Sequence, residues 1–205
     1  MNEKVLILTD ALFLGKGKHK AAYIHPEDET KCVKVPFELP DTDIDRELEY
    51  REHLRKKHRR PTMLTEYYGT IETNKGLGYV YERVCDYDGR TSKALKELFT
   101  NPGMAEEHLG VSNVEVLRKF REVWMKEYIV TSDTDFVNYF AQKLSPTEFA
   151  IRIIDNVGTP AHFPLAYIFD YFAKKRAAKY WKRIVDRYLK DHATEKEKEQ
   201  VKKLF

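Results

Sequence analysis

The sequence predicts an α+β fold with a small strand-rich first part and a reduced, mostly helical second part. Three observations support this expectation. Short β-prone runs separated by turn residues fill most of the first 88 residues, and amphipathic helical patterns dominate from Ser92 onward. One hairpin pattern interrupts these helices near residue 140. We therefore expect two parts, 1–88 and 89–205, joined by a polar connector.

The first element is a β-prone run from Val5 to Leu14, which predicts a strand. Gly15-Lys16-Gly17-Lys18 follows, and a second strand-like run ends at Ile24. Two glycines give such a hairpin a permissive backbone, and its lysines favour a phosphate electrostatically. A Gly-rich hairpin of this kind covers the ATP phosphates in kinases, although Lys20 takes the place of a third glycine. A plain basic hairpin is the alternative interpretation.

The next strand runs from Lys31 to Pro36. Its lysine, Lys34, lies between Val33 and Val35 and therefore points to the opposite face from them. This pattern is similar to that of the kinase strand lysine that pairs with the α- and β-phosphates. A surface lysine on a half-exposed strand is the alternative.

A helix is expected to begin at Asp41-Thr42-Asp43 and to continue through Lys57, because strong helix formers fill this stretch. Kinases pair their strand lysine with a glutamate of such a helix. We choose Glu47 as the partner of Lys34, with Glu49 and Glu52 as rivals that the sequence does not separate.

Two further strands are expected at Leu64–Ile71 and Gly78–Val84, around a turn at Asn74-Lys75-Gly76. The second strand leads into a polar, Gly-containing connector. A kinase hinge would lie at this place, with the backbone groups of Glu82 to Val84 facing adenine.

The second part contains several helical patterns. They are predicted at Ser92–Phe99, Asn113–Tyr128, Pro164–Phe172 and Lys174–His192, followed by a helix-prone end at Thr194–Phe205. The longest apolar stripe belongs to the second helix, and its spacing predicts a face buried in the core. This stripe comprises Val116, Leu117, Phe120, Val123, Trp124 and Tyr128.

The stretch from Ile129 to Gly158 contains the residues with the most chemistry. Asp133 precedes Asn138 by five residues, a hairpin turns at Leu144–Glu148, and Asp155-Asn156-Val157-Gly158 follows. Protein kinases arrange a proton-accepting aspartate and two Mg²⁺ ligands in this way. Oxygen ligands from Asn138 and Asp155 would suit a hard cation, and Asp133 would orient the attacking hydroxyl. The alternative is a hairpin with polar ends, since Asp and Asn are common in turns.

Composition narrows the function classes. The content of hydrophobic residues, 42%, argues against global disorder, and two cysteines are too few for a disulfide framework. We expect no signal peptide, no membrane span and a cytoplasmic location. Basic clusters at 51–60 and 174–187 fit solvated helix faces or an anionic partner. Nucleic acid is not expected as a partner, because the net charge is only +3 and no known reader motif occurs.

The whole pattern resembles the YrbL family, also called PhoP regulatory network proteins, over roughly Leu14 to Tyr188. This family is similar to a small offshoot of the protein-kinase-like superfamily. The segments that carry the resemblance include Leu14-Gly15-Lys16-Gly17-Lys18-His19, His25-Pro26-Glu27-Asp28, Cys32-Val33-Lys34-Val35, Arg46-Glu47-Leu48, Tyr68-Gly69-Thr70-Ile71-Glu72-Thr73, Asp86-Tyr87-Asp88-Gly89 and Asp155-Asn156-Val157-Gly158.

The resemblance implies a kinase-like two-lobed fold that binds ATP and Mg²⁺. It implies a phosphotransferase acting on a small molecule or on itself, with a protein acceptor less favoured by the short C-terminal part. Carried over by position, the catalytic residues are Lys34, Glu47 and Asp133, and the metal ligands are Asn138 and Asp155. The nucleotide-binding residues are Gly15, Gly17, Lys18, Lys34, Glu82 and Val84.

The short C-terminal part and two departures from the kinase pattern favour a second possibility, a catalytically impaired, pseudokinase-like regulatory or binding module. Asn156 replaces the Phe of the Asp-Phe-Gly triplet, but small-molecule kinases also vary at this position. Thr131-Ser132 occupies the His-Arg places before the aspartate. Asp135 places a negative charge where many kinases have a cation, which opposes the transferring phosphoryl group.

Overall fold

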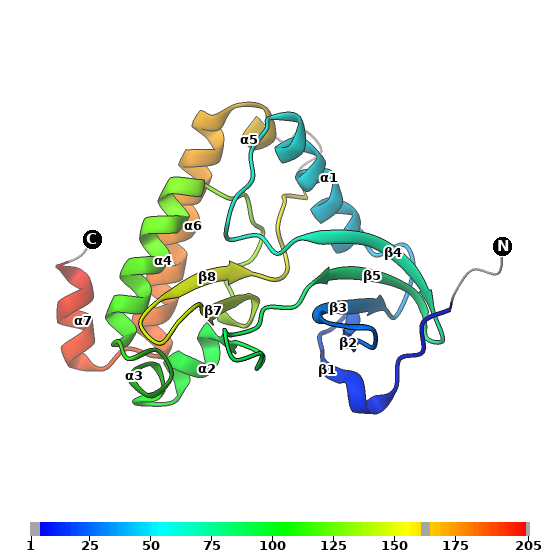
Figure 1. Cartoon of the computed structure of the whole chain (residues 1–205). Helices are drawn as coiled ribbons and strands as arrows, with labels where there is room; N and C mark the ends of the chain where they lie inside the picture. Colours follow the sequence, from blue (N-terminus) through cyan, green and yellow to red (C-terminus); the bar gives the residue numbers. More distant parts are fainter. Residues whose placement is uncertain (1–4, 161–164, 204–205) are drawn as a thin grey trace.

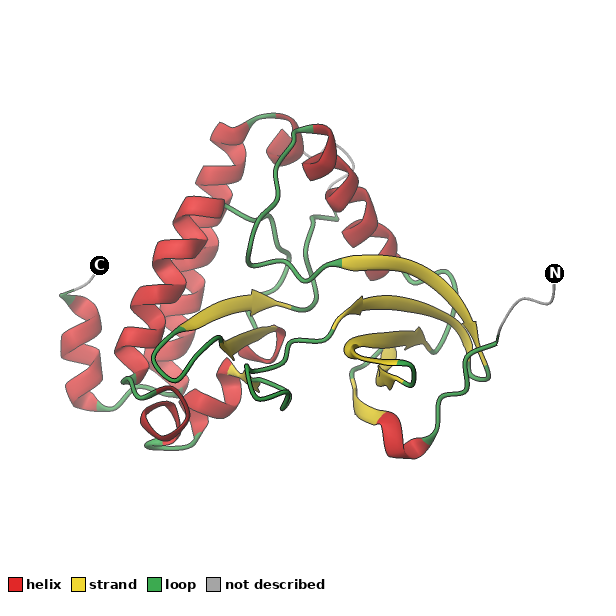
Figure 2. Cartoon of the chain, in the orientation of Figure 1, coloured by secondary structure: helices red, strands yellow, loops and turns green. Residues whose placement is uncertain are grey.

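The computed structural model describes residues 5–160 and 165–203 and has a mixed α+β architecture, which confirms the predicted fold class (Figures 1 and 2). Within these residues, a five-stranded antiparallel sheet has the order β1-β2-β3-β5-β4. Its strands are β1 (Phe13–Lys16), β2 (Lys20–His25), β3 (Asp28–Pro36), β4 (Tyr67–Thr73) and β5 (Gly76–Glu82). Helix α1 (Thr42–Lys56) lies between β3 and β4 in the chain.

The second part is mostly helical, as predicted. Its helices are α2 (Leu95–Thr100), α3 (Met104–Leu109), α4 (Asn113–Glu127), α5 (Leu165–Ile168), α6 (Asp170–Asp191) and α7 (Glu195–Lys202). A small sheet of order β6-β7-β8 contains β6 (Lys93–Ala94), β7 (Tyr139–Lys143) and β8 (Phe149–Ile153). The hairpin predicted around residue 145 is therefore present as β7 and β8.

Local sequence explains the well-predicted helices. The Asp41 carboxylate accepts hydrogen bonds from the N–H groups of Asp43 and Ile44, so it caps α1 at the expected start. The Ser112 hydroxyl does the same for α4. The predicted stripe of α4 is core, because Val116, Leu117, Phe120 and Trp124 are fully buried and pack on α6 and the small sheet.

The strand predicted from Val5 to Leu14 is wrong for most of its length. Leu6 forms one isolated bridge to Thr73, a 3₁₀ turn covers Asp10–Leu12, and β1 begins only at Phe13. The reason is the Asn74 side chain, whose oxygen accepts from Leu8 N–H at 2.8 Å while its nitrogen donates to Leu8 C=O at 3.3 Å. The side chain thus takes the place of a neighbouring strand for the Leu8 backbone.

Other differences are smaller. Residues 93–94 pair with β7, so helix α2 begins at Leu95 rather than at Ser92, and α3 is an element that the sequence pattern did not indicate. The helix break expected near residue 173 lies at Phe169. Pro164, the expected start of that helix, lies outside the described residues, as does the predicted end at Phe205. Cys32 is buried, and its burial raises the pKa of the thiol, in keeping with a small apolar residue.

Gly78 shows how closely the first sheet is packed. A Cβ at this position would lie 2.5 Å from Cγ1 of Val33 on the neighbouring strand and 3.3 Å from the Ile71 carbonyl oxygen. Any other residue there would have to displace the Val33 side chain on β3, the strand that carries Lys34.

Candidate functional site

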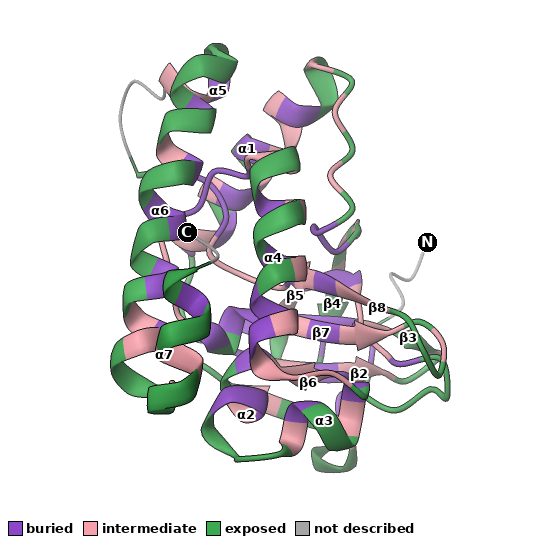
Figure 3. Ribbon diagram, turned by 90° about the vertical axis from the view of Figure 1, so that its left-hand side faces the viewer, coloured by how far each residue is buried: buried purple, intermediate pink, exposed green. Residues whose placement is uncertain are grey.

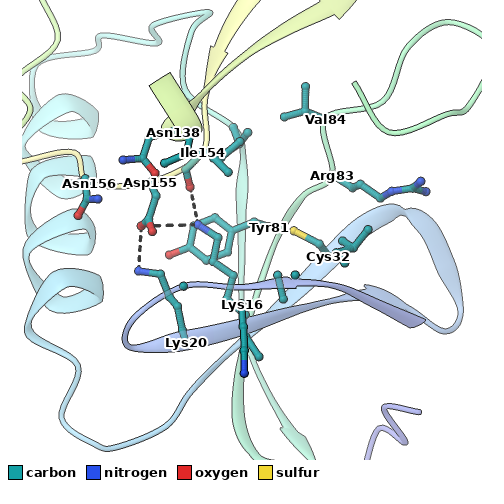
Figure 4. Close-up of a pocket in the computed structure, with 18 of the residues that line it drawn as sticks. Lys16, Lys20, Cys32, Tyr81, Arg83, Val84, Asn138, Ile154, Asp155 and Asn156 are labelled. Atoms are coloured by element: carbon teal, nitrogen blue, oxygen red, sulfur yellow. Dashed lines mark hydrogen bonds and ion pairs between the residues drawn. The ribbon is translucent and has the colours of Figure 1, made fainter. Parts of the chain in front are cut away.

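A cavity of about 490 Å³ lies between the first sheet and the β7–β8 hairpin. Figure 4 shows side chains from both parts of the chain pointing toward it. All eight residues predicted to bind the nucleotide or the metal line it, namely Gly15, Gly17, Lys18, Lys34, Glu82, Val84, Asn138 and Asp155. Glu47 and Asp133 do not line it. The expected convergence of Lys34, Asn138 and Asp155 on one cleft is therefore present in the structure.

The cavity has two chemically different ends. Toward the connector, the lining includes the apolar side chains of Cys32 and Val84 together with Arg83 (Figure 4), and Leu14, Phe140 and Ile154 add further apolar surface to the cavity. Near the β1–β2 hairpin, it is lined by Gly15, Lys16, Gly17, Lys18, Lys20, Lys34, Asn138 and Asp155. A flat apolar group joined to a polyanion would match these two ends.

Lys34 is the best-anchored cation of the site. Its side chain is 8% exposed, its ammonium donates to the Ile154 carbonyl, and it lies 3.9 Å from Oδ1 of Asp155. The ammonium also lies 4.2 Å from the ring centroid of Tyr81 on β5. These contacts fix a positive charge at the junction of the first sheet and the hairpin.

The structure contradicts the predicted ion pair between Lys34 and Glu47. Within the described residues, the Glu47 carboxylate pairs with Arg51, one turn later on α1, at 2.7 and 2.9 Å. Arg51 also donates to the Thr65 carbonyl at 2.7 Å, which fixes its fork beside Glu47. A partner on the same helix therefore takes the buried carboxylate, and Lys34 interacts with Asp155 instead.

The rival glutamates are not partners of Lys34 either. Glu49 lies 3.8 Å from His53, and Glu52 forms a two-point contact with Arg55 at 2.7 Å. Both carboxylates are on the outer part of α1, because their side chains are 59% and 43% exposed.

Asp155 is the carboxylate to which the cations of the site converge. Lys20 on β2 lies 2.9 Å from Oδ1, closer than Lys34 (Figure 4). Burial raises the pKa of the Asp155 carboxyl, but the Lys34 and Lys20 ammonium groups outweigh it and hold this pKa below its ordinary value. Burial likewise lowers the pKa of Lys20, and Asp155 more than offsets this effect, so the pKa is raised. Asp155 and Lys20 are therefore both charged at neutral pH.

From the sequence, Lys20 was identified only as the residue that takes the place of a third glycine in the Gly-rich hairpin. Its role as the nearest partner of Asp155 depends on the register of β2 and β3, in which Lys20 lies opposite Pro36. A basic residue at the hairpin end was the only signal in the sequence, and it does not identify a partner 135 positions away.

Asn138 and Asp155 are adjacent because β7 and β8 pair beside them. Tyr139 lies opposite Ile153, and the Ile154 N–H donates to the Asn138 carbonyl at 3.0 Å. The Asn138 side-chain nitrogen donates to Asp133 at 2.8 Å, so its amide oxygen is left for another group. An amide oxygen and a carboxylate side by side are ligands that suit Mg²⁺ together with water and phosphate. Among the described residues, no group of three or more His, Cys, Asp or Glu side chains forms a site able to hold a metal by itself.

Asp133 lies directly behind this wall of the cavity. One carboxylate oxygen accepts from the side-chain amides of Asn138 and Asn156 at 2.8 and 3.3 Å. The other accepts from the backbone N–H groups of Thr134 and Asp135 at 2.6 and 2.9 Å. Because all four donors come from this loop and from Asn156, the carboxylate organises the loop.

The departures from the kinase pattern have clear structural partners. The Thr131 hydroxyl donates to the Asn156 carbonyl at 2.7 Å, and the Thr131 carbonyl accepts from Arg176 on α6 at 2.8 and 3.2 Å. Asn156 has φ of 60°, a left-handed conformation that asparagine tolerates better than most residues. Gly158 has φ of 91°, and a Cβ there would lie 2.9 Å from the Arg46 carbonyl oxygen.

The connector after β5 closes the apolar end. The Glu82 carboxylate pairs with Arg152 on β8, and the Glu82 N–H donates to the Glu66 carbonyl at 2.9 Å, so both groups already have partners within the chain. The Val84 carbonyl accepts from Ser92 N–H at 3.0 Å. The Val84 N–H donates to no group among the described residues, and Val84 lines the cavity. This N–H can serve a ligand in the apolar end.

Comparison with known proteins gives a family. The family model described as "PhoP regulatory network protein YrbL" matches residues 6–189. The "Uncharacterized protein YrbL" of Escherichia coli (strain K12) is 31% identical over 175 residues, which cover 84% of this chain and 82% of that protein. A Shigella flexneri protein of the same name matches with the same values.

Proposed function

The chain belongs to the YrbL family of PhoP regulatory network proteins, and we propose that it is a kinase-like phosphotransferase. In this proposal it binds ATP with Mg²⁺ and transfers the terminal phosphoryl group to a small molecule or to itself. The observation that carries the proposal is the convergence of glycines, lysines, connector backbone and oxygen ligands around one cavity with an apolar end and a cationic end.

The arrangement of the chain supports a kinase-like two-lobed fold with parts at 1–88 and 89–205. The antiparallel sheet with α1 precedes the connector, and the helices with the small β6–β8 sheet follow it (Figure 1). The cavity draws its lining from both sides of that connector.

The residues present fit the nucleotide. The free Val84 N–H and the apolar side chains around it suit adenine, and Gly15 and Gly17 present backbone without side chains at the other end. A Cβ at Gly15 would meet no atom within 4 Å, so local packing does not require glycine there. The absence of a side chain at this position leaves room for phosphates, toward which Lys18 and Lys34 contribute charge.

The residues also fit a divalent cation. Asp155 supplies a charged oxygen and Asn138 a neutral one, which leaves further positions for phosphate and water oxygens. When bound, Mg²⁺ would neutralise phosphate charge during transfer.

In the proposed reaction, the acceptor hydroxyl forms a new bond to the γ-phosphorus while the bond from that phosphorus to the β–γ bridging oxygen breaks, leaving ADP. Asp133 orients the hydroxyl and takes its proton, which requires one of its carboxylate oxygens to release an asparagine amide. Lys34 stabilises the phosphate oxygens throughout.

A second candidate function is nucleotide binding without transfer, in a pseudokinase-like regulatory module. Two observations favour it. Asp133 is fully engaged by its own loop and by Asn156. Asp135, which lies 3.6 Å from Arg187, adds a negative charge nearby in the sequence. Both candidates use the same cavity and differ only in the acid–base step.

The test combines thermal shift with ATP turnover, each measured with and without Mg²⁺. We expect ATP to stabilise the chain in an Mg²⁺-dependent manner and to be slowly hydrolysed or transferred. Asp155→Asn should abolish the Mg²⁺ dependence and the turnover, whereas Asp133→Asn should lower turnover by about a hundredfold and keep nucleotide binding. Asp186→Asn, which changes an exposed carboxylate on α6, is the matched control.

The outcomes separate the candidates. A thermal shift with no phosphate transfer supports the binding module. Unchanged turnover in Asp155→Asn rejects the proposed metal site. No shift with ATP, in the presence or absence of Mg²⁺, rejects both candidates.

A further inference from the structure

Four segments that are distant in the sequence meet at one end of the molecule. They are the end of α1 with residues 57–60, the end of α4 at Tyr128, helix α5, and the start of α6. Figure 1 shows α5 together with the end of α1 and the start of α6 at the top of the view, away from the β1–β2 hairpin. We call this region the apical surface, formed by residues 55–60, 125–128 and 168–175.

Hydrogen bonds, an ion pair and cation–ring contacts join these segments. Lys57 donates to the Ile168 carbonyl at 2.8 Å and pairs with Asp170 at 3.0 Å. The Tyr128 hydroxyl donates to Asp170 at 3.1 Å. The Arg59 guanidinium lies 3.9 Å from the centroid of the Tyr128 ring, and the Lys174 ammonium lies 5.2 Å from it. The apical surface is therefore a fixed assembly rather than a set of independent ends.

Large apolar side chains are exposed on this surface. Ile168 is 43% exposed, Phe169 53%, Tyr171 67% and Phe172 39%. Phe172 contacts the rings of Phe169 and Tyr171, so the aromatic groups form one patch. Figure 3 shows the start of α6 mostly in the colour of exposed residues, although further along this helix buried positions recur. Contiguous exposed apolar groups of this kind mark an interaction site.

Basic residues surround the apolar patch. The three segments of the apical surface contain eight lysines and arginines and two acidic residues, Glu127 and Asp170. Lys57 pairs with Asp170, and the Glu127 carboxylate accepts hydrogen bonds from Thr62 and Met63. Arg55, Lys56, Arg60, Lys174 and Lys175 are exposed. The surface thus presents aromatic groups flanked by net positive charge.

We propose that the apical surface docks on an anionic phospholipid bilayer, with Ile168, Phe169, Tyr171 and Phe172 entering the interface and the basic residues meeting lipid phosphates. The proposal is independent of the cavity and of the proposed phosphoryl transfer. Aromatic side chains favour the boundary between headgroups and hydrocarbon, and lysines and arginines beside it are attracted to anionic lipids.

The character of the patch favours a bilayer over a nucleic acid. Ile168 and Phe169 carry no polar group, so a nucleic-acid surface would leave them without a suitable environment, whereas hydrocarbon accepts them. Among the described residues, no helix has the length and apolar character needed to cross a membrane, so the proposed attachment is peripheral.

The test is co-sedimentation of the full chain with vesicles of phosphatidylcholine alone and of phosphatidylcholine mixed with phosphatidylglycerol. We expect binding to the mixed vesicles only, weakened by salt. Phe169→Ser with Tyr171→Ser should lower the partition coefficient by at least about tenfold. Phe13→Ser with Tyr87→Ser removes two exposed aromatic groups elsewhere and should leave binding unchanged.

The contribution of positive charge is tested with two pairs of lysine variants, both on α6. Lys174→Gln with Lys175→Gln should lower the partition coefficient by about thirtyfold, because two basic side chains are lost from the membrane-facing region. Lys182→Gln with Lys190→Gln removes the same charge from exposed positions further along α6 and should have little effect. Circular dichroism of each variant checks the fold.

Three results would overturn the proposal. The first is no binding to either vesicle, and the second is binding that the apical and control variants change equally. The third is binding of a DNA or RNA oligonucleotide, instead of vesicles, with the same dependence on Lys174 and Lys175, since this would assign the surface to nucleic acid.

Discussion

The ion pair between Lys20 and Asp155 gives a sharp test of the site's electrostatics, through the change Lys20→Met. The two charged groups are 2.9 Å apart, and their side chains are 11% and 19% exposed. A pair in such surroundings has a Coulomb energy of several kcal/mol, about 4 at a separation of 4 Å, before the cost of desolvation is subtracted. Lys34 stays 3.9 Å from the same carboxylate oxygen in the variant, so Asp155 does not become an unpaired buried charge. We therefore expect a loss of about 1–2 kcal/mol of folding free energy.

The measurement is chemical and thermal denaturation followed by circular dichroism at neutral pH. For a chain of this size, the predicted loss corresponds to a fall in Tm of about 3–6 °C. Lys16→Met is the matched control, because Lys16 is exposed on the same hairpin and forms no ion pair among the described residues. The control should change stability by less than about 0.5 kcal/mol.

The pH dependence follows from the directions of the two pKa shifts. Burial raises the pKa of Asp155, but the lysines lower it further, so its stabilising contribution is present above the ordinary value of about 4 and is lost as pH falls through the folded pKa. The pKa of Lys20 is raised by Asp155 against the effect of burial, so its contribution is full below about pH 10 and is lost above the folded pKa. The difference between the native chain and Lys20→Met should therefore be constant between these limits and shrink in acid. A difference that persists unchanged in acid, or that equals the effect of Lys16→Met, would refute this reasoning.

Two further predictions concern the surroundings of the site. Gly158→Ala should lower the free energy of unfolding by about 2–4 kcal/mol. The new Cβ would lie 2.9 Å from the Arg46 carbonyl oxygen and 2.8 Å from the Tyr167 hydroxyl, and the residue would have to keep φ of 91°. A urea titration with no change in midpoint would contradict this prediction. Arg51→Met should cost about 3–5 kcal/mol, because it leaves the Glu47 carboxylate, 1% exposed, without a cation. Adding Glu47→Gln should recover much of that loss, and a double variant as unstable as the single one would show that Arg51 acts in another way.

Much of this fold could be predicted from local patterns. The stripe of α4 and the capping residues of α1 and α4 are short-range signals, since the residues that decide them are neighbours in the sequence. The strand over residues 5–14 was wrong because Asn74, far along the chain, supplies the hydrogen bonds of Leu8. A β-prone composition does not reveal whether another strand is available beside it.

The sequence predicted which residues line the cavity, but it did not predict which of them form ion pairs with one another. Alternation on β3 placed Lys34 on one face, and the kinase-like arrangement at the two ends of the hairpin suggested Asn138 and Asp155 as metal ligands. The structure brings all three to one cavity. The choice of Glu47 as partner of Lys34 followed the ion pair that kinases form between their strand lysine and a helix glutamate. Arg51 was visible in the sequence at the i+4 position, and its planar fork also reaches the Thr65 carbonyl.

The ion pair between Lys20 and Asp155 determines which contact must break before the proposed cation and nucleotide can bind. Asp155 can bind a divalent cation through Oδ1 only if Lys20, 2.9 Å away, gives up its contact. The two lysines would then be free to contact phosphate oxygens, so the site would exchange one set of ion pairs for another without leaving a buried charge unpaired. Because Lys20 lies on β2, this exchange also requires the hairpin end to adjust as the ligand enters. In Lys20→Met the Asp155 carboxylate has lost its nearest cation, so Mg²⁺ has one competitor fewer at this oxygen. The variant should therefore need less Mg²⁺ for half-maximal nucleotide binding, even though its folded state is less stable.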